Sequence, residues 1–276
     1  MKKVIIPFDG SHFSHGAIDF AIELNEWEPI LLSGVFLPQL DFANIWSYGG
    51  GAMAGPVFLP SMEDVDVDAI ERNIDRFKTI CERNGVEHRV HKNFFEAAVP
   101  ELRNESRFAD LLIIGSEAFY ENMGTNEPNT YLKDTLRQAE CPVVIVPEQF
   151  TFPESVVLSY DGSESSVYAI KQFAYLFPQL TTKASLLVTA GTEDDEQEIP
   201  EASNIEELVA RHFSDLTFMR LQIEPAKYFS TWLMYRKSTI LISGSFGRSA
   251  LSDFLKKSFI SDVISTHRIP VFLTHR

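Results

Sequence analysis

A glycine-rich turn in the C-terminal half contains residue types that can hold a phosphate. Gly244-Ser245-Phe246-Gly247 follows an apolar run and precedes a helical pattern. Such a turn lets backbone N–H groups approach a phosphate closely, and the dipole of the following helix favours the negative charge. Glycines at a strand-to-helix turn can also serve the turn alone, and the Lys-Ser/Thr pair of a P-loop is absent. The glycines alone therefore leave two interpretations, a phosphate site or a purely structural turn.

Two aspartates end apolar runs and are followed by Gly-Ser. Asp9 comes after Val4–Phe8, and Asp161 comes after Val156–Tyr160. A carboxylate at the end of a strand can accept hydrogen bonds from a ligand. It can equally cap the turn or helix that comes next. The residues alone leave both roles open.

The Asp-Gly-Ser sequence belongs to an internal repeat. Leu111–Ser116 corresponds to Ile240–Ser245, and Cys141–Val146 corresponds to Ile269–Thr274. The Asp-Gly-Ser copies are 152 residues apart (161 − 9), whereas the Gly-Ser copies are 129 apart (244 − 115), so the second copy is 23 residues shorter in its middle. A repeat of this length indicates two copies of one structural unit.

Each copy alternates continuous apolar runs with amphipathic patterns. Continuous Val, Ile and Leu runs are typical of strands covered on both faces, as in a parallel sheet with helices on both sides. We predict an α/β fold of two doubly wound, Rossmann-like, five-stranded parallel sheets, with ligands at the carboxyl ends of the strands. The predicted domains are residues 1–149 and 150–276, divided in the proline-containing segment 147–153. The expected strands are 4–8, 30–36, 86–90, 111–114, 143–146, 156–160, 184–189, 216–223, 240–242 and 271–273. The expected helices include 13–24, 70–81, 97–103, 131–139, 165–176, 205–213 and 229–235. Ser11 or Ser14 can cap the first of these helices.

Composition excludes several classes of function. Asp and Glu outnumber Lys and Arg by 39 to 24, which disfavours binding to nucleic acid. No apolar stretch approaches the roughly 20 residues that span a bilayer, and the apolar run at the N-terminus is too short for a signal peptide, so we expect no membrane association and a cytoplasmic location. Cys81 and Cys141 lack metal-ligand spacing, and we expect buried free thiols.

Taken together, the repeated strand ending in Asp-Gly-Ser, the strand ending in Gly-Ser, the Gly-x-x-Gly turn and the Cys-Pro-Val or Ile-Pro-Val strand resemble the universal stress protein family in a tandem form. The resemblance covers almost the whole chain. It implies an adenine nucleotide alpha-hydrolase-like fold, with the two domains related by a pseudo-two-fold axis and paired through their last strands. Association of two such chains into a homodimer is left open.

Many members of that family bind ATP through Gly, two residues, Gly, nine residues, then Gly and Ser or Thr. Gly244 and Gly247 match this pattern, but the next pair is Lys257-Ser258. Lys257 either blocks the triphosphate or adds a positive charge to it. The resemblance implies ATP or AMP in the second domain, held by Asp161, Gly162, Val188, Gly244, Ser245, Gly247, Arg248, Lys257, Ser258 and Phe259.

The first half departs further from the pattern. Gly115 is kept, but Ala118 replaces the second glycine, and Asn129-Thr130 replaces the later pair. We expect this site to be degenerate for ATP, with Asp9, Gly115 and Thr130 as its remaining candidate residues for another ligand.

The other polar clusters are best interpreted as ordinary polar residues without a metal or catalytic role. His12 and His15 lie too close in sequence to Asp9 to share a helix face, and His88 and His91 point to opposite sides of a strand. We therefore predict no metal site and no catalytic residue, with at most slow ATP hydrolysis. The insertion at residues 40–61, rich in glycine and aromatic residues, suits a surface loop, a lid or a partner surface.

The favoured hypothesis is a stress-response binding and regulatory protein that takes an adenine nucleotide mainly in its second domain. The alternative is a scaffold with degenerate sites that binds a small apolar ligand or a partner through the first-half insertion.

Overall fold

The computed structural model describes most of the regular structure of the chain. The described residues are 1–8, 12–37, 67–92, 98–116, 130–190, 199–221, 232–233, 235–236, 238–244, 264 and 269–274. No helix in these ranges is both long and apolar enough to cross a membrane.

Ten strands form one sheet in the order β3-β2-β1-β4-β5-β10-β9-β6-β7-β8. Within each set of five, every neighbouring pair is parallel, as the unbroken apolar runs predict. The strands are β1 (Lys2–Phe8), β2 (Ile30–Phe36), β3 (Glu87–Lys92), β4 (Leu111–Gly115), β5 (Val143–Val146), β6 (Ser155–Ser159), β7 (Ala184–Ala190), β8 (Leu216–Leu221), β9 (Thr239–Gly244) and β10 (Val271–Thr274).

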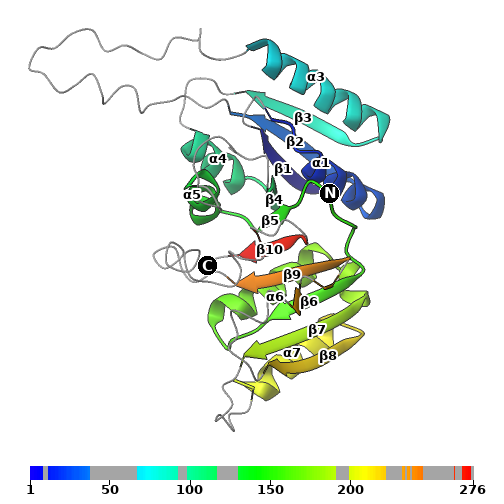
Figure 1. Ribbon diagram of the computed structural model, residues 1–276, viewed down its shortest axis with the longest axis vertical. Helices are drawn as coiled ribbons and strands as arrows, with labels where there is room; N and C mark the ends of the chain where they lie inside the picture. Colours follow the sequence, from blue (N-terminus) through cyan, green and yellow to red (C-terminus); the bar gives the residue numbers. More distant parts are fainter. Residues whose placement is uncertain are drawn as a thin grey trace, which may run out of the picture.

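The antiparallel pairing of β5 with β10 joins the two sets at the centre of the sheet (Figure 1). Phe272 lies opposite Val144 in this pairing, and both side chains are buried. The pairing of last strands that the family resemblance implies is therefore present within one chain.

Helices cover both faces of the sheet. Buried residues of α1, α3, α6 and α7 pack in one core layer that is continuous between the two sets of strands, and α4 and α5 pack in the layer on the other face. The helices are α1 (His15–Trp27), α3 (Val67–Arg83), α4 (Ala98–Arg107), α5 (Thr130–Gln138), α6 (Glu164–Leu176) and α7 (Ala202–His212), with a 3-10 turn at Leu180–Thr182.

The segment between β5 and β6 adds aromatic rings to this shared layer. Phe152 lies 5.1 Å from Phe20 of α1 between ring centroids and 4.8 Å from Trp27. Phe20 is also 6.5 Å from Phe177, which follows α6. The segment that the sequence marks as a boundary thus packs against α1, whose Phe20 in turn contacts the end of α6.

The predicted strands and helices are all found where the chain is described, with ends shifted by a few residues. Strand β9 extends to Gly244, two residues beyond the predicted Ile242, and α4 continues to Arg107. Of the two serines proposed to cap α1, Ser14 caps it, because its hydroxyl oxygen accepts a hydrogen bond from the Ala17 N–H at 3.3 Å. Ser11 lies outside the described residues.

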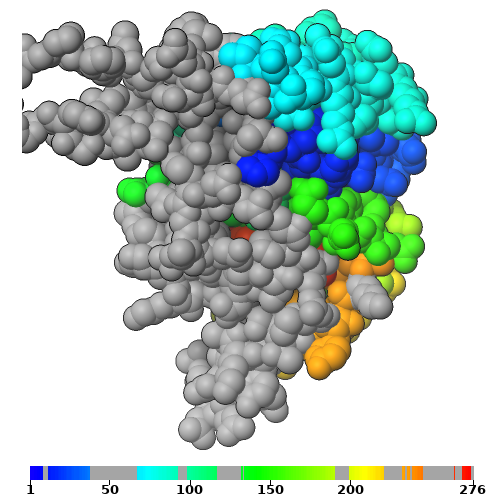
Figure 2. Space-filling view, turned by 45° about the horizontal axis from the view of Figure 1, so that its top comes forward, coloured from blue at the N-terminus to red at the C-terminus, as the bar shows by residue number. Residues whose placement is uncertain are grey.

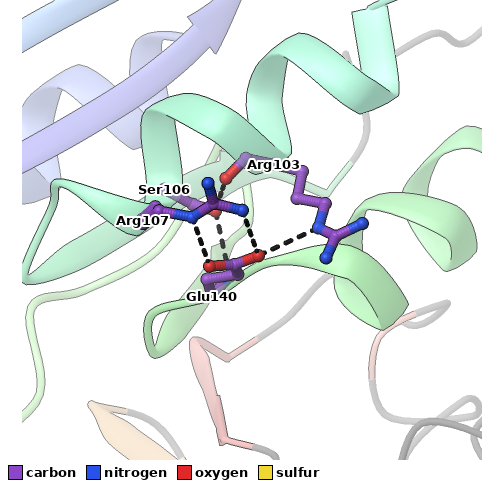
Figure 3. Close-up of polar contacts among 4 residues, drawn as sticks. All are labelled: Arg103, Ser106, Arg107 and Glu140. Atoms are coloured by element: carbon purple, nitrogen blue, oxygen red, sulfur yellow. Dashed lines mark hydrogen bonds and ion pairs between the residues drawn. The ribbon is translucent and has the colours of Figure 1, made fainter.

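A cluster of charged side chains fixes α4 to the turn after α5 (Figure 3). Arg107 donates two hydrogen bonds to the Glu140 carboxylate, at 2.8 and 2.9 Å, and Arg103 donates a third at 2.9 Å. The Glu140 N–H donates to Ser106 at 2.9 Å. The two guanidinium groups lower the pKa of Glu140 to about 2 from the ordinary 4.5.

Replacing Phe272 by Ala should destabilise the protein by about 3–5 kcal/mol, because the ring is fully buried at the seam and packs against Phe173 and Phe177. Urea unfolding followed by circular dichroism measures the change. Phe108→Ala is the matched control, since that ring is 72% exposed, and it should change the unfolding free energy by less than about 0.5 kcal/mol. Equal effects of the two substitutions would contradict the importance of the seam.

Glu140 should stabilise the fold in a pH-dependent way. Its pKa is lower in the folded protein than the ordinary 4.5, so its stabilising contribution is full above about pH 4.5 and is lost as the pH falls toward 2. The difference in unfolding free energy between the natural chain and Glu140→Gln should therefore shrink steadily between pH 5 and pH 3. Glu206→Gln, at an exposed position on α7, should show no such trend.

Candidate functional site

Three neighbouring strands of the second half end at the same level. Strand β6 lies between β9 and β7, with Leu158 opposite Ile242 and Ser159 opposite Val188. One step further along, the Tyr160 N–H donates to the Val188 carbonyl at 3.0 Å. Gly244, at the end of β9, is level with Tyr160 by this register. This is the point where the strand order reverses, and it is where doubly wound sheets bind ligands.

Asp161 and Gly162 form the turn that leaves β6. The Asp161 carboxylate accepts a hydrogen bond from the Ser163 N–H at 2.9 Å, so the capping role weighed from sequence is realised. Gly162 has φ of +80°, and a Cβ there would lie 2.6 Å from the Pro200 ring. Only glycine combines this conformation with so close an approach. Asp161 is exposed, and no described residue hydrogen-bonds to its other carboxylate oxygen.

The end of β9 packs directly against the first turn of α6. A Cβ on Gly244 would lie 2.2 Å from the Ser165 carbonyl carbon and 2.4 Å from the Ser166 nitrogen. The Ser163 hydroxyl caps α6 by accepting from the Ser166 N–H at 3.2 Å. Gly244 therefore brings the start of the glycine turn against the N-terminus of α6.

Sequence reasoning missed polar groups beside these residues. Tyr160 is buried, and its hydroxyl donates to the Pro200 carbonyl at 2.8 Å, which holds the 199–201 segment over the turn. Thr189, directly after Val188, is 4% exposed, and its hydroxyl has no hydrogen-bond partner among the described residues. The serine run after Asp161-Gly162 was a usable signal, because serines after a strand often cap the next helix.

The structure describes only part of the predicted site. Asp161, Gly162, Val188 and Gly244 come together as above. Gly115 ends β4 in the first half, and the backbone of Thr130 begins α5. The remaining predictions, Asp9, Ser245, Gly247, Arg248, Lys257, Ser258 and Phe259, lie outside the described residues, as does the 40–61 insertion.

In the first half, aromatic rings fill the equivalent level. Phe8 and Phe36 are opposite each other in the β1–β2 register, where the second half has Tyr160 and the position of Thr189. The Phe8 ring stacks on Phe36 at 4.7 Å and on Phe13 at 5.1 Å between centroids. Arg76 then covers the Phe13 ring at 4.6 Å. At these positions the first half therefore has a stack of apolar rings, whereas the second half has Tyr160 and Thr189, which carry hydroxyl groups.

A carboxylate of the chain itself occupies the N-terminus of α1. Glu148, which follows β5, accepts hydrogen bonds from the His15 N–H at 2.8 Å and the Gly16 N–H at 3.1 Å, and its other oxygen accepts from the Ser14 hydroxyl at 2.5 Å. That oxygen would also lie 3.1 Å from a Cβ on Gly115. An internal anion thus satisfies the helix end next to the first-half glycine.

The two cysteines are buried and free, as predicted. Burial raises the pKa of each thiol to about 12, so both remain protonated at neutral pH. The described residues contain no group of three His, Cys, Asp or Glu side chains that could hold a metal ion.

No family model matches the sequence, and no curated protein matches it. Solved structures match along the whole chain. A universal stress protein from Archaeoglobus fulgidus DSM 4304 superposes with a TM-score of 0.67 at 14% identity, over 100% of this chain and 96% of that one. The chain has the universal stress protein fold.

Two further structures show how widely this fold is used. A putative universal stress protein from Pseudomonas aeruginosa UCBPP-PA14 superposes with a TM-score of 0.56 at 12% identity, over 100% of this chain and 93% of that one. The cytoplasmic domain of a prokaryotic cation chloride cotransporter superposes with a TM-score of 0.54 at 12% identity, over 99% and 94%. Proteins with different names therefore share this fold, and the function has to be argued from the residues of the site.

Gly244→Ala should destabilise the protein more than Gly115→Ala. The new methyl group at 244 meets backbone atoms of α6, which cannot rotate away, and we expect a loss of about 2–3 kcal/mol. At 115 the nearest atom is the Ser14 hydroxyl oxygen, which can rotate away at the loss of its helix cap, and the Ser14 Cβ at 2.8 Å requires only a small backbone shift, so we expect a loss of about 1–2 kcal/mol. Chemical denaturation of the two variants measures the difference. The reverse order would contradict the packing described here.

Proposed function

We propose that this chain is a tandem universal stress protein that binds an adenine nucleotide, ATP or AMP, at the carboxyl ends of β6, β7 and β9. It acts in the stress response by binding and regulation rather than by catalysis. The observation that carries the proposal is that Val188, Gly244 and Asp161 lie at three successive levels at the point of strand reversal, Val188 beside Ser159, Gly244 beside Tyr160 and Asp161 directly after Tyr160. The domains in this proposal are residues 1–149 and 150–276.

The groups at these levels suit a nucleoside. Asp161 offers an exposed carboxylate that can accept hydrogen bonds from ribose hydroxyls, and D161N would keep one oxygen for the turn. The Thr189 hydroxyl is a buried polar group that the described residues leave unused. Gly244 begins the glycine turn, whose following residues would hold phosphate through backbone N–H groups and, if it points inward, the Lys257 ammonium.

The contrast between the halves supports one nucleotide site. The first half has stacked rings at the strand ends and the Glu148 carboxylate beside Gly115, and a negative charge there repels phosphate. Glu148 comes two residues after Val146, which pairs with Gly115. Arg276 has the same place after Thr274, which pairs with Gly244. The charge is therefore reversed at this position of the sequence repeat.

Asp161→Asn should weaken ATP binding about tenfold in isothermal titration calorimetry, because it removes the charge that strengthens a hydrogen bond to the ribose by about 1–2 kcal/mol. The turn should survive, because the asparagine oxygen can accept the Ser163 N–H. Circular dichroism and the midpoint of thermal unfolding verify that the fold is intact.

Asp9→Asn is the matched control, since it makes the same change at the repeated position of the first half and should leave ATP affinity unchanged. Equal losses in both variants would place the nucleotide elsewhere. Absence of ATP and AMP binding by the natural chain at millimolar nucleotide would exclude the proposal.

A further inference from the structure

A recess lies away from the strand ends, on the outer face of α1. It is an open groove of about 800 Å³, with residues of α1 as its floor, the C-terminal end of α3 as one wall and the 148–152 segment as the other. In Figure 2 the blue surface of the N-terminal part of the chain lies between the cyan surface of α3 and a green surface further along the chain. We name this recess the α1 groove.

The walls of the α1 groove are partly apolar. Ile80 of α3 lies on one side, and Phe150 and Phe152 lie on the other, with Ile22 between them on α1. All four side chains pack against the core layer yet remain partly exposed. These partly covered carbon surfaces can bury further area against an apolar side chain of a ligand.

The charge of the groove is predominantly negative. Asp19, Glu23 and Glu148 line it, and Arg83 is the one cation among the described residues that line it. Burial raises the pKa of Asp19, with the His15 charge opposing and the Glu148 charge adding to the rise. Burial also raises the pKa of Glu23, and the charges of Glu26 and Asp19 add to it. A cation in the groove would offset this repulsion.

The acidic floor is not a requirement of the fold. Asp19 and Glu23 are the fifth and ninth residues after Ser14, which caps α1. The fifth and ninth residues after Ser163, which caps α6, are Tyr168 and Gln172. The repeated helix packs on the same face of the sheet without either carboxylate, so the charges serve something other than packing.

We propose that the α1 groove binds an extended, basic and partly apolar peptide segment of a partner protein. Residues four apart on a helix are about 6 Å apart along its axis. Alternate side chains of an extended peptide are about 6.6 Å apart. Two basic side chains at alternate positions can therefore pair with Asp19 and Glu23 at once, while an apolar side chain two positions further along the same face of the peptide contacts the walls. This site is separate from the nucleotide site, and the inference does not depend on it.

The probe is a fluorescein-labelled hexapeptide with leucine at position 1, arginine at positions 3 and 5 and serine elsewhere, which places leucine and both arginines on one face; it is titrated with the full chain and followed by fluorescence anisotropy. The double variant Asp19→Asn with Glu23→Gln should weaken its binding roughly five- to tenfold. Arg83→Ala should strengthen it roughly twofold, because it removes the groove's cation. Circular dichroism verifies that each variant is folded, and unchanged or weaker binding by folded Arg83→Ala would overturn the proposal.

The matched control is Glu206→Gln with Glu207→Gln, which removes two exposed charges from α7, far along the sheet order from α1. It should leave the affinity within twofold. Equal loss in both double variants would show general attraction to an acidic protein and overturn the proposal. So would unchanged binding of a peptide with citrulline for arginine or serine for leucine. Binding of spermine alone, with no peptide binding, would assign the groove to a small polycation instead.

Discussion

The antiparallel pairing of β5 with β10 makes two repeated units into a single sheet, and the rest of the structure depends on it. The pairing aligns Val144 with Phe272. It also places α1 and α6 on the same face, where Phe20, Phe152 and Phe177 share one core layer. An isolated five-stranded half would expose this edge and these rings to water, at a large hydrophobic cost. The same packing holds Glu148 at the N-terminus of α1 and positions the wall of the α1 groove.

Once the two halves support each other structurally, they are free to differ at their strand ends. The first half closes its end with stacked rings and an internal carboxylate, which gains stability at the expense of a ligand space. The second half keeps an exposed Asp161, a Thr189 hydroxyl to which no described residue hydrogen-bonds, and a glycine packed against a helix start. The same fold thereby has apolar, filled strand ends in its first half and strand ends with available polar groups in its second half.

Much of the fold was predictable from the chain, because local patterns carry it. The apolar runs at 30–36 and 143–146 coincide with strands β2 and β5 residue for residue, because strands covered on both faces are mostly apolar along their length. The Asp-Gly-Ser and Gly-x-x-Gly motifs alone predicted that Gly162 and Gly244 lie at the ends of strands. The roles of Tyr160, Thr189 and Glu148 were not, because each depends on a contact between segments distant in sequence.

The sequence by itself determined the alternation of strands and helices, the duplication and the residues that end each strand. These follow from hydrophobic periodicity and from turn chemistry, which act over a few residues. Only the tertiary structure decided that the aromatic residues Phe8, Phe13 and Phe36 stack at the first-half strand ends, and that Asp19, Glu23 and Glu148 line one groove. Such groupings depend on strand order and helix placement, which bring together side chains that no local pattern connects.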